Sequence, residues 1–100
     1  MSHVTTHVLD TSAGRPAEGI AVTLERDGEV VATGTTDADG RIADLGPDRL
    51  DAGTYRLRFD TAGRSPFFPE VVIAFAVTDD THLHVPLLLS PYSYSTYLGS

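Results

Sequence analysis

Histidine and arginine are the side chains of this sequence best suited to catalysis at neutral pH. His82 and His84 lie two residues apart in a run of alternating hydrophobicity, so both should point to the same side of a strand. An imidazole changes its charge near neutral pH and can accept a proton from water during hydrolysis. With His7 as a third ligand, the pair also fits the ligand count of a catalytic zinc site. The residues alone leave acid–base and metal-assisted chemistry open.

Arginine supplies all of the positive charge. The chain has 14 acidic and seven basic residues, every basic one an Arg, and a formal net charge of −7. This field repels nucleic-acid phosphates and anionic lipid surfaces, so neither is expected as a partner. An anionic small molecule could bind only where one or two arginines overcome the field locally. Arg41 is such a candidate, because the turn cluster Asp37-Ala38-Asp39-Gly40 should deliver it directly onto a short strand.

The size and composition predict one domain over residues 1–100 that is stabilised by packing. A chain of 100 residues with 41% hydrophobic residues can form a single core. The absence of Cys excludes disulfides and thiolate metal sites. No signal-peptide pattern and no apolar run of membrane-spanning length is visible, so a cytoplasmic location is expected.

The elements that must position these side chains are short strands. Hydrophobicity alternates with a period of two, and turn residues interrupt it about every ten residues, which is typical of a sandwich or barrel. Asp27-Gly28 predicts a hairpin turn between two of the runs. The expected fold is an all-β sandwich of about eight strands, with at most one short turn of helix near residues 61–65. The main expected strands cover residues 4–9, 20–25, 29–35, 41–42, 55–59, 71–77, 83–89 and 92–98.

Two of these runs also suggest assembly. Residues 71–77 are apolar on both faces, which predicts a central strand covered on each side by the domain or by a partner subunit. Residues 92–98 are rich in Tyr, and a chain end of this kind is expected to be packed, against another subunit in the simplest case.

Three sequence blocks carry a family resemblance. The longest runs from His84 to Tyr97 and ends in Gly99-Ser100; the others are His7–Asp10 with Gly14–Ala17, and Phe67–Glu70. Together they resemble the transthyretin-like family on its 5-hydroxyisourate hydrolase branch. The middle of the chain also resembles carboxypeptidase-regulatory-type sandwiches, but the Tyr-rich tail favours the first family.

The resemblance implies a transthyretin-like (prealbumin-like) sandwich of two four-stranded sheets. It also implies a homotetramer with active sites in a cleft where two dimers meet. The family's reaction opens the six-membered ring of 5-hydroxyisourate, a product of urate oxidation, by attack of water on a ring amide. Neither a cofactor nor a metal is implied.

Carried over by position, the resemblance also implies a set of site residues. His7 and His84 would be candidates for accepting the proton of water, and Arg41 would bind the ring and stabilise developing negative charge. The terminal tetrapeptide would line the substrate site. The full expected set is His7, Arg41, His84, Tyr97, Leu98, Gly99 and Ser100.

The sequence departs from the family pattern at two places that matter. The terminal tetrapeptide normally reads Tyr-Arg-Gly-Ser, and Leu98 stands at the Arg position, which predicts weakened or altered activity. Residues 61–66 form a shorter segment than usual, so the family's small helix should be trimmed. Two other functions remain open: a non-catalytic transthyretin-like protein that binds small apolar or aromatic ligands in the inter-dimer cleft, and a purely structural interaction module.

Overall fold

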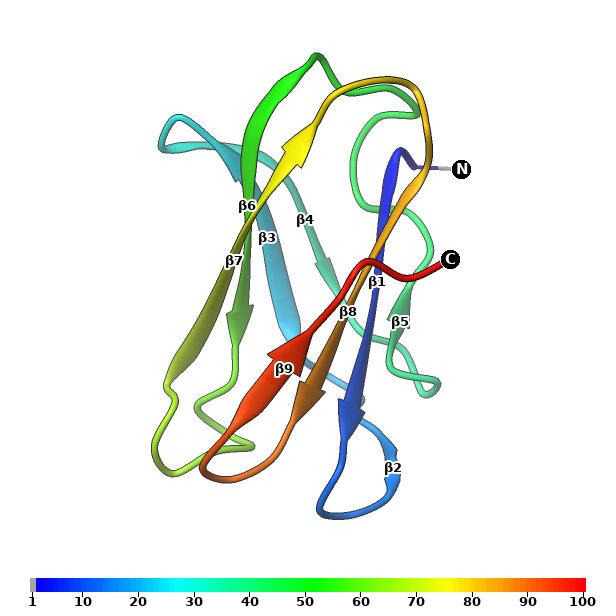
Figure 1. Cartoon of the computed structure of the whole chain (residues 1–100). Coiled ribbons are helices and arrows are strands. Elements are labelled where there is room, and N and C mark those ends of the chain that lie inside the picture. The colour runs from blue at the N-terminus through cyan, green and yellow to red at the C-terminus, as the bar shows by residue number, and fades with distance from the viewer. Residues whose placement is uncertain (1) are drawn as a thin grey trace.

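Nine β-strands joined by turns make up the computed structural model, which describes residues 2–100 (Figure 1). That part of the chain contains no helix, and hence none that could span a bilayer. The strands are β1 (Val4–Asp10), β2 (Arg15–Pro16), β3 (Ala21–Arg26), β4 (Glu29–Thr35), β5 (Arg41–Ile42), β6 (Gly53–Asp60), β7 (Glu70–Val77), β8 (Leu83–Leu89) and β9 (Tyr94–Thr96).

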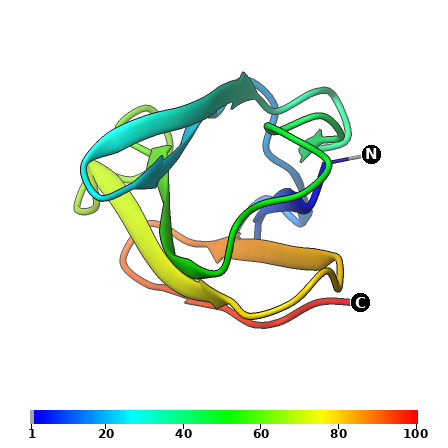
Figure 2. The ribbon, with the colours of Figure 1, turned by 90° about the horizontal axis from the view of Figure 1, so that it is seen from above.

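The strands form two sheets that face each other, as the view from above shows (Figure 2). One sheet has the order β2-β1-β8-β9, with β5 also paired to β1, and the other has the order β4-β3-β6-β7. All pairs are antiparallel except β1 with β8, which run parallel. The expected all-β, transthyretin-like sandwich is confirmed. β2 is a ninth strand that was not expected, and β5, expected over residues 41–42, makes one sheet five-stranded.

The core lies between the sheets, and alternation along the strands builds it most clearly in β6 and β1. In β6 the side chains of Tyr55, Leu57 and Phe59 are at most 2% exposed, whereas Arg56 on the opposite face is exposed. In β1 the inward side chains Val4 and Val8 are fully buried. Successive residues of a strand point to opposite faces, so these strands turn one side toward the core and the other side away from it.

The predicted hairpin is confirmed, and its turn shows why the sequence reads Asp-Gly there. β3 and β4 pair from Ala21 opposite Thr35 to Arg26 opposite Glu29. Asp27 and Gly28 both have positive φ, at 53° and 79°, as a two-residue hairpin turn requires. The segment at residues 61–65 forms a single turn closed by hydrogen bonds to the Thr61 carbonyl, without a helix.

One expectation about strand position is wrong. Residues 71–77 were predicted to form a central strand, but β7 lies at the edge of its sheet and pairs only with β6. Its outward side chains are uncovered within the chain, and Val72 is 37% exposed. β9 is the edge of the other sheet, and Figure 1 shows both edges on the same side of the sandwich. The apolar outer face of β7 is therefore exposed to solvent within this chain.

We expect adjacent positions of β6 to differ sharply in their effect on stability. Leu57→Ala removes a fully buried side chain and should lower the free energy of unfolding by about 2–5 kcal/mol. Arg56→Ala changes an exposed side chain and should alter it by less than about 0.5 kcal/mol. Urea denaturation at one fixed protein concentration measures both. Equal losses would contradict the assignment of β6 faces.

Candidate active site

Arg41 is positioned by the tight turn that the sequence predicts at Asp37–Gly40. The Asp37 carboxylate accepts hydrogen bonds from the backbone N–H of Asp39 at 2.9 Å and of Arg41 at 3.0 Å. Gly40 has a φ of 74°, and a Cβ there would collide with the carbonyl oxygen of Val8. The turn can therefore approach β1 closely, and it leads Arg41 into β5 as expected.

Two pairings of β1 gather the predicted site residues on the outer face of its sheet. In the antiparallel pairing with β5, His7 lies opposite Arg41. In the parallel pairing with β8, Thr5 lies opposite His84, and a hydrogen bond of 2.9 Å joins Thr5 Oγ1 to His84 Nδ1. Because Thr5 and His7 share a face of β1, His7, Arg41 and His84 all lie on the side of the sheet away from the core.

A hollow of about 370 Å³ opens on this face. Arg41 and His84 line it, together with Ser100 from the C-terminal segment. His7 lies beside the hollow without lining it. The full lining is Thr5, Thr6, Arg41, Ile42, Ala43, His82, His84 and Ser100.

The C-terminal segment returns along β8 and packs against the ring of His84. Gly99 forms a bridge to His84, with its N–H donating to the His84 carbonyl at 2.8 Å. A Cβ at Gly99 would come within 2.6 Å of His84 Cδ2, so only Gly allows the chain to pass over the imidazole. The next residue, Ser100, is thereby carried to the hollow.

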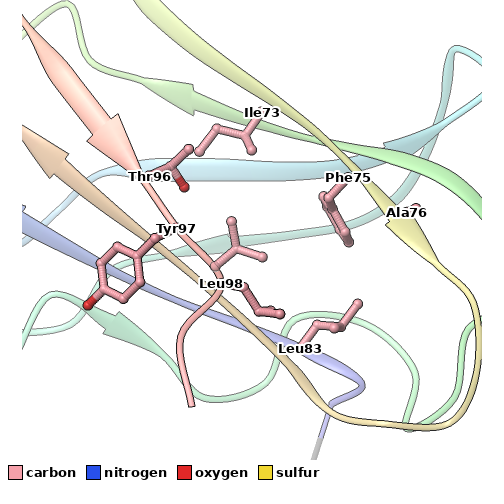
Figure 3. A pocket seen from close by; sticks show the side chains of 8 residues that line it. Ile73, Phe75, Ala76, Leu83, Thr96, Tyr97 and Leu98 are labelled. Carbon is pink, nitrogen blue, oxygen red and sulfur yellow. The ribbon is translucent and has the colours of Figure 1, made fainter.

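Tyr97 and Leu98 lie elsewhere within one chain. They line a second, apolar pocket of about 340 Å³ between β7 and the C-terminal segment, shown in Figure 3. Phe75 and Leu83 form other parts of its wall. The side chains of Tyr97 and Leu98 are 58% and 72% exposed. Of the expected tetrapeptide, Ser100 lines the hollow and Gly99 contacts His84, whereas Tyr97 and Leu98 are not part of the lining.

The electrostatics of the hollow favour a neutral His84 and a free Arg41. Burial is the main cause that lowers the pKa of His84 below its ordinary value, and the charges of Arg41, His7 and His82 lower it further. A neutral imidazole can accept a proton. Arg26, Arg49, Arg58 and Arg64 pair with carboxylates, whereas Arg41 has no ion-pair partner among residues 2–100. Its guanidinium is thus available to an anionic or carbonyl-rich ligand.

The Nε2 atom of His7 is buried and has no hydrogen-bond partner among the described residues. A buried nitrogen without a partner typically costs about 1–3 kcal/mol, and such groups are found at functional sites. His3 offers a contrast, because its Nδ1 accepts the N–H of Leu50 at 2.9 Å and its Nε2 donates to the Thr81 carbonyl at 3.0 Å. His3 is a structural residue, and His7 has an unused nitrogen next to Arg41.

The histidines do not form the three-ligand metal site that their number allowed. No group of three His, Cys, Asp or Glu side chains within residues 2–100 is arranged to hold a metal ion. Instead, the Thr5 hydroxyl lies 2.9 Å from His82 Nε2 and 2.9 Å from His84 Nδ1. Sequence reasoning assigned no role to Thr5, because Thr is common in strands and only the pairing of β1 with β8 reveals its neighbours.

Comparison with known proteins shows which family this sequence and fold resemble. The model of the HIUase/Transthyretin family matches residues 4–99. The 5-hydroxyisourate hydrolase of Caulobacter vibrioides is 46% identical over 115 residues and is covered completely, as is this chain. The uric acid degradation bifunctional protein TTL of Arabidopsis thaliana is 49% identical over 119 residues, but this chain, 97% of which is aligned, spans only 37% of it.

Two solved structures extend the likeness to three dimensions. The 5-hydroxyisourate hydrolase of Klebsiella pneumoniae superposes with a TM-score of 0.89 and 44% identity, over 97% of this chain and 98% of that one. Sea bream transthyretin in complex with thyroxine gives a TM-score of 0.84 and 34% identity, over 96% and 93% of the two chains. Sequence, family model and fold agree throughout, and the chain belongs to the HIUase/Transthyretin family.

Proposed function

We propose that this protein hydrolyses 5-hydroxyisourate by opening its six-membered ring. The observation that carries the proposal is that Arg41 and His84, far apart in the sequence, line one hollow with Ser100. The relatives from Caulobacter and Klebsiella, which are named for this activity, match nearly the whole chain. The substrate is a small, carbonyl-rich ring. Its carbonyl oxygens can accept hydrogen bonds from the Arg41 guanidinium, and the His84 imidazole can accept a proton from water beside it.

In the proposed mechanism His84 acts as the general base. Its neutral imidazole takes a proton from water while the water oxygen attacks the carbonyl carbon of the ring amide. The amide C–N bond then breaks, and the proton passes to the leaving nitrogen. Arg41 binds the ring through parallel N–H donors and stabilises the negative charge that develops on the carbonyl oxygen. The reaction needs only water and side chains of this protein.

Three other positions have supporting parts in the proposal. His7, which lies opposite Arg41 and has an unpaired Nε2, supports the site from beside the hollow. Ser100 contributes a hydroxyl to the hollow, and Gly99 lets the chain pass over His84. Tyr97 and Leu98 would contribute to the substrate site only after subunits assemble, because within one chain they line the apolar pocket instead.

Replacing His84 or Arg41 should reduce turnover strongly. Loss of a general base typically lowers kcat by about 10²- to 10⁴-fold, so His84→Ala should fall in this range. Arg41→Ala should cost roughly ten- to 100-fold in kcat/KM, the worth of a charge-assisted hydrogen bond. The measurement is the absorbance decay of freshly generated 5-hydroxyisourate. Arg56→Ala, an exposed Arg on the other sheet, is the matched control and should keep full activity.

A second candidate function is non-catalytic binding of small apolar or aromatic ligands. It is favoured by Leu98, which places an exposed apolar side chain where the family pattern has Arg. The same experiment separates the candidates. If the substrate decays no faster with protein than in buffer, and thyroxine raises the Tm, binding is the function, since a ligand of the native state stabilises it. If Leu98→Arg increases an existing turnover, the hydrolase assignment stands and Leu98 weakens it.

The acid limb of the activity should lie below the ordinary pKa of histidine. Burial lowers the pKa of His84, so the imidazole stays neutral at pH values where a solvated His is already charged. Activity is therefore retained below pH 6.5 and lost only as the pH falls through the lowered pKa. The pH profile of kcat/KM and an NMR titration of His84 measure this. In Arg41→Gln the NMR midpoint should rise, because a repelling charge is gone; an unchanged midpoint would contradict the proximity of the two groups.

We further propose a homotetramer, with residues from more than one subunit around each site. β7 and β9 are unpaired edges on one side of the sandwich, with exposed Val72, Tyr97 and Leu98 nearby. Uncovered apolar edges favour association with another chain. Analytical ultracentrifugation should give four times the chain mass of 10.7 kDa. A monomer with full activity would contradict the shared site. The cytoplasmic location expected from the sequence stays a prediction.

A further inference from the structure

A single hydroxyl lies between two imidazoles at the rim of the hollow. Thr5 Oγ1 is 2.9 Å from Nε2 of His82 and 2.9 Å from Nδ1 of His84. Both are hydrogen-bond distances. A hydroxyl has one hydrogen to donate, so Thr5 can donate to only one of the two rings and must accept from the other. The direction of this short chain decides which nitrogen of His84 carries a proton.

The backbone at Ser2 sets that direction. Nδ1 of His82 lies 3.1 Å from the carbonyl oxygen of Ser2, which can only accept. The hydrogen of a neutral His82 therefore sits on Nδ1, and its Nε2 is an acceptor. Thr5 donates to that Nε2 and accepts from Nδ1–H of His84. The remaining nitrogen of His84, Nε2, then holds a free lone pair.

We propose that Thr5 and His82 are positioning residues that hold His84 in the tautomer whose Nε2 can accept a proton. This inference rests on the proposed function, in which His84 is the general base. In the other tautomer Nε2 would carry a hydrogen and could not take one from water. The hydrogen-bond chain from the Ser2 carbonyl through His82 and Thr5 thus keeps Nε2 of His84 ready to accept a proton, and it acts on the reaction through His84.

The alternative is that the Thr5 hydroxyl only stabilises the fold. Its position beside the parallel pairing of β1 with β8 makes that reasonable, because β8 and the start of β1 would both be steadied by it. The two roles differ in what they change. If the role is only structural, loss of the hydroxyl lowers the Tm and leaves the tautomer of His84 unchanged. If the hydroxyl positions His84, its loss changes the tautomer of His84 and lowers kcat.

Thr5→Val and Thr5→Ser form a matched pair for this test. Val keeps the β-branched shape but has no hydroxyl, and Ser keeps the hydroxyl. The first readout is the ¹⁵N NMR spectrum of histidine-labelled protein at a pH where His84 is neutral. We expect Nδ1 of His84 to be protonated in the unaltered protein and in Thr5→Ser, and a mixture of tautomers in Thr5→Val. His82→Ala, which leaves the Thr5 hydroxyl free to turn, should also give a mixture.

The second readout is kinetic. Thr5→Val should lower kcat by about two- to tenfold with little change in KM, the effect of one lost hydrogen bond, and Thr5→Ser should restore most of it. Thr5→Val with the original His84 tautomer and unchanged kcat would overturn the proposal. The NMR readout does not need turnover, so a protein that does not hydrolyse 5-hydroxyisourate but shows the expected tautomers would refute the proposed function and leave the hydrogen-bond chain intact.

Discussion

The parallel pairing of β1 with β8 is the constraint on which the rest of the site depends. It joins residues 79 positions apart in the sequence, Thr5 and His84, in one register. A shift of that register by one residue would turn either Thr5 or His84 toward the core and separate them. The register is fixed from the other side of the sheet, where the buried Val4, Val8 and Leu87 pack against the second sheet. The apolar core therefore sets the alignment of the polar face.

The pairings of β1 with β5 and β8 also gather positive and titratable groups on one face of the sheet. The chain carries a net charge of −7, yet the outer face of the sheet concentrates Arg41 with His7, His82 and His84. Arg41 keeps its charge at any physiological pH, so its field adds to burial in lowering the pKa of His84. Arg41 thus has two effects: it can attract an electron-rich ring, and it favours the neutral, basic form of His84.

Much of the fold could be predicted from the sequence, because alternation and turn chemistry act locally. The Asp27-Gly28 turn, the buried face of β6 and the short strand at Arg41 were all predicted and are confirmed. Local patterns carry no information on strand order, however, and the apolar run of residues 71–77 looked central when it forms an edge. Its two apolar faces fit a strand that is covered from outside the chain as well as from within.

The site could be predicted only in part, and for a related reason. His7, Arg41, His84 and the C-terminal segment were predicted as site residues from the family resemblance, and the roles given to them stay predictions. Thr5 and the tautomer-setting contact of His82 were missed. A Thr in a strand is ordinary for its β-propensity, and its meaning depends on the imidazoles that a distant strand brings beside it. The closeness of Gly99 to His84 is likewise a fact of packing that no spacing in the sequence predicts.

The order of the strands along the chain also affects biosynthesis. β1 leaves the ribosome before the other strands of the sandwich, whereas its partner β8 and the segment that passes over His84 are made after β2 to β7. Until then a nascent chain holds the apolar side of β1 without its neighbour, a state in which exposed strands attract chaperones or one another. The residues that complete the hollow and the strand that completes this side of the core thus arrive together, with β8 and the segment after it, so a chain interrupted before β8 has neither.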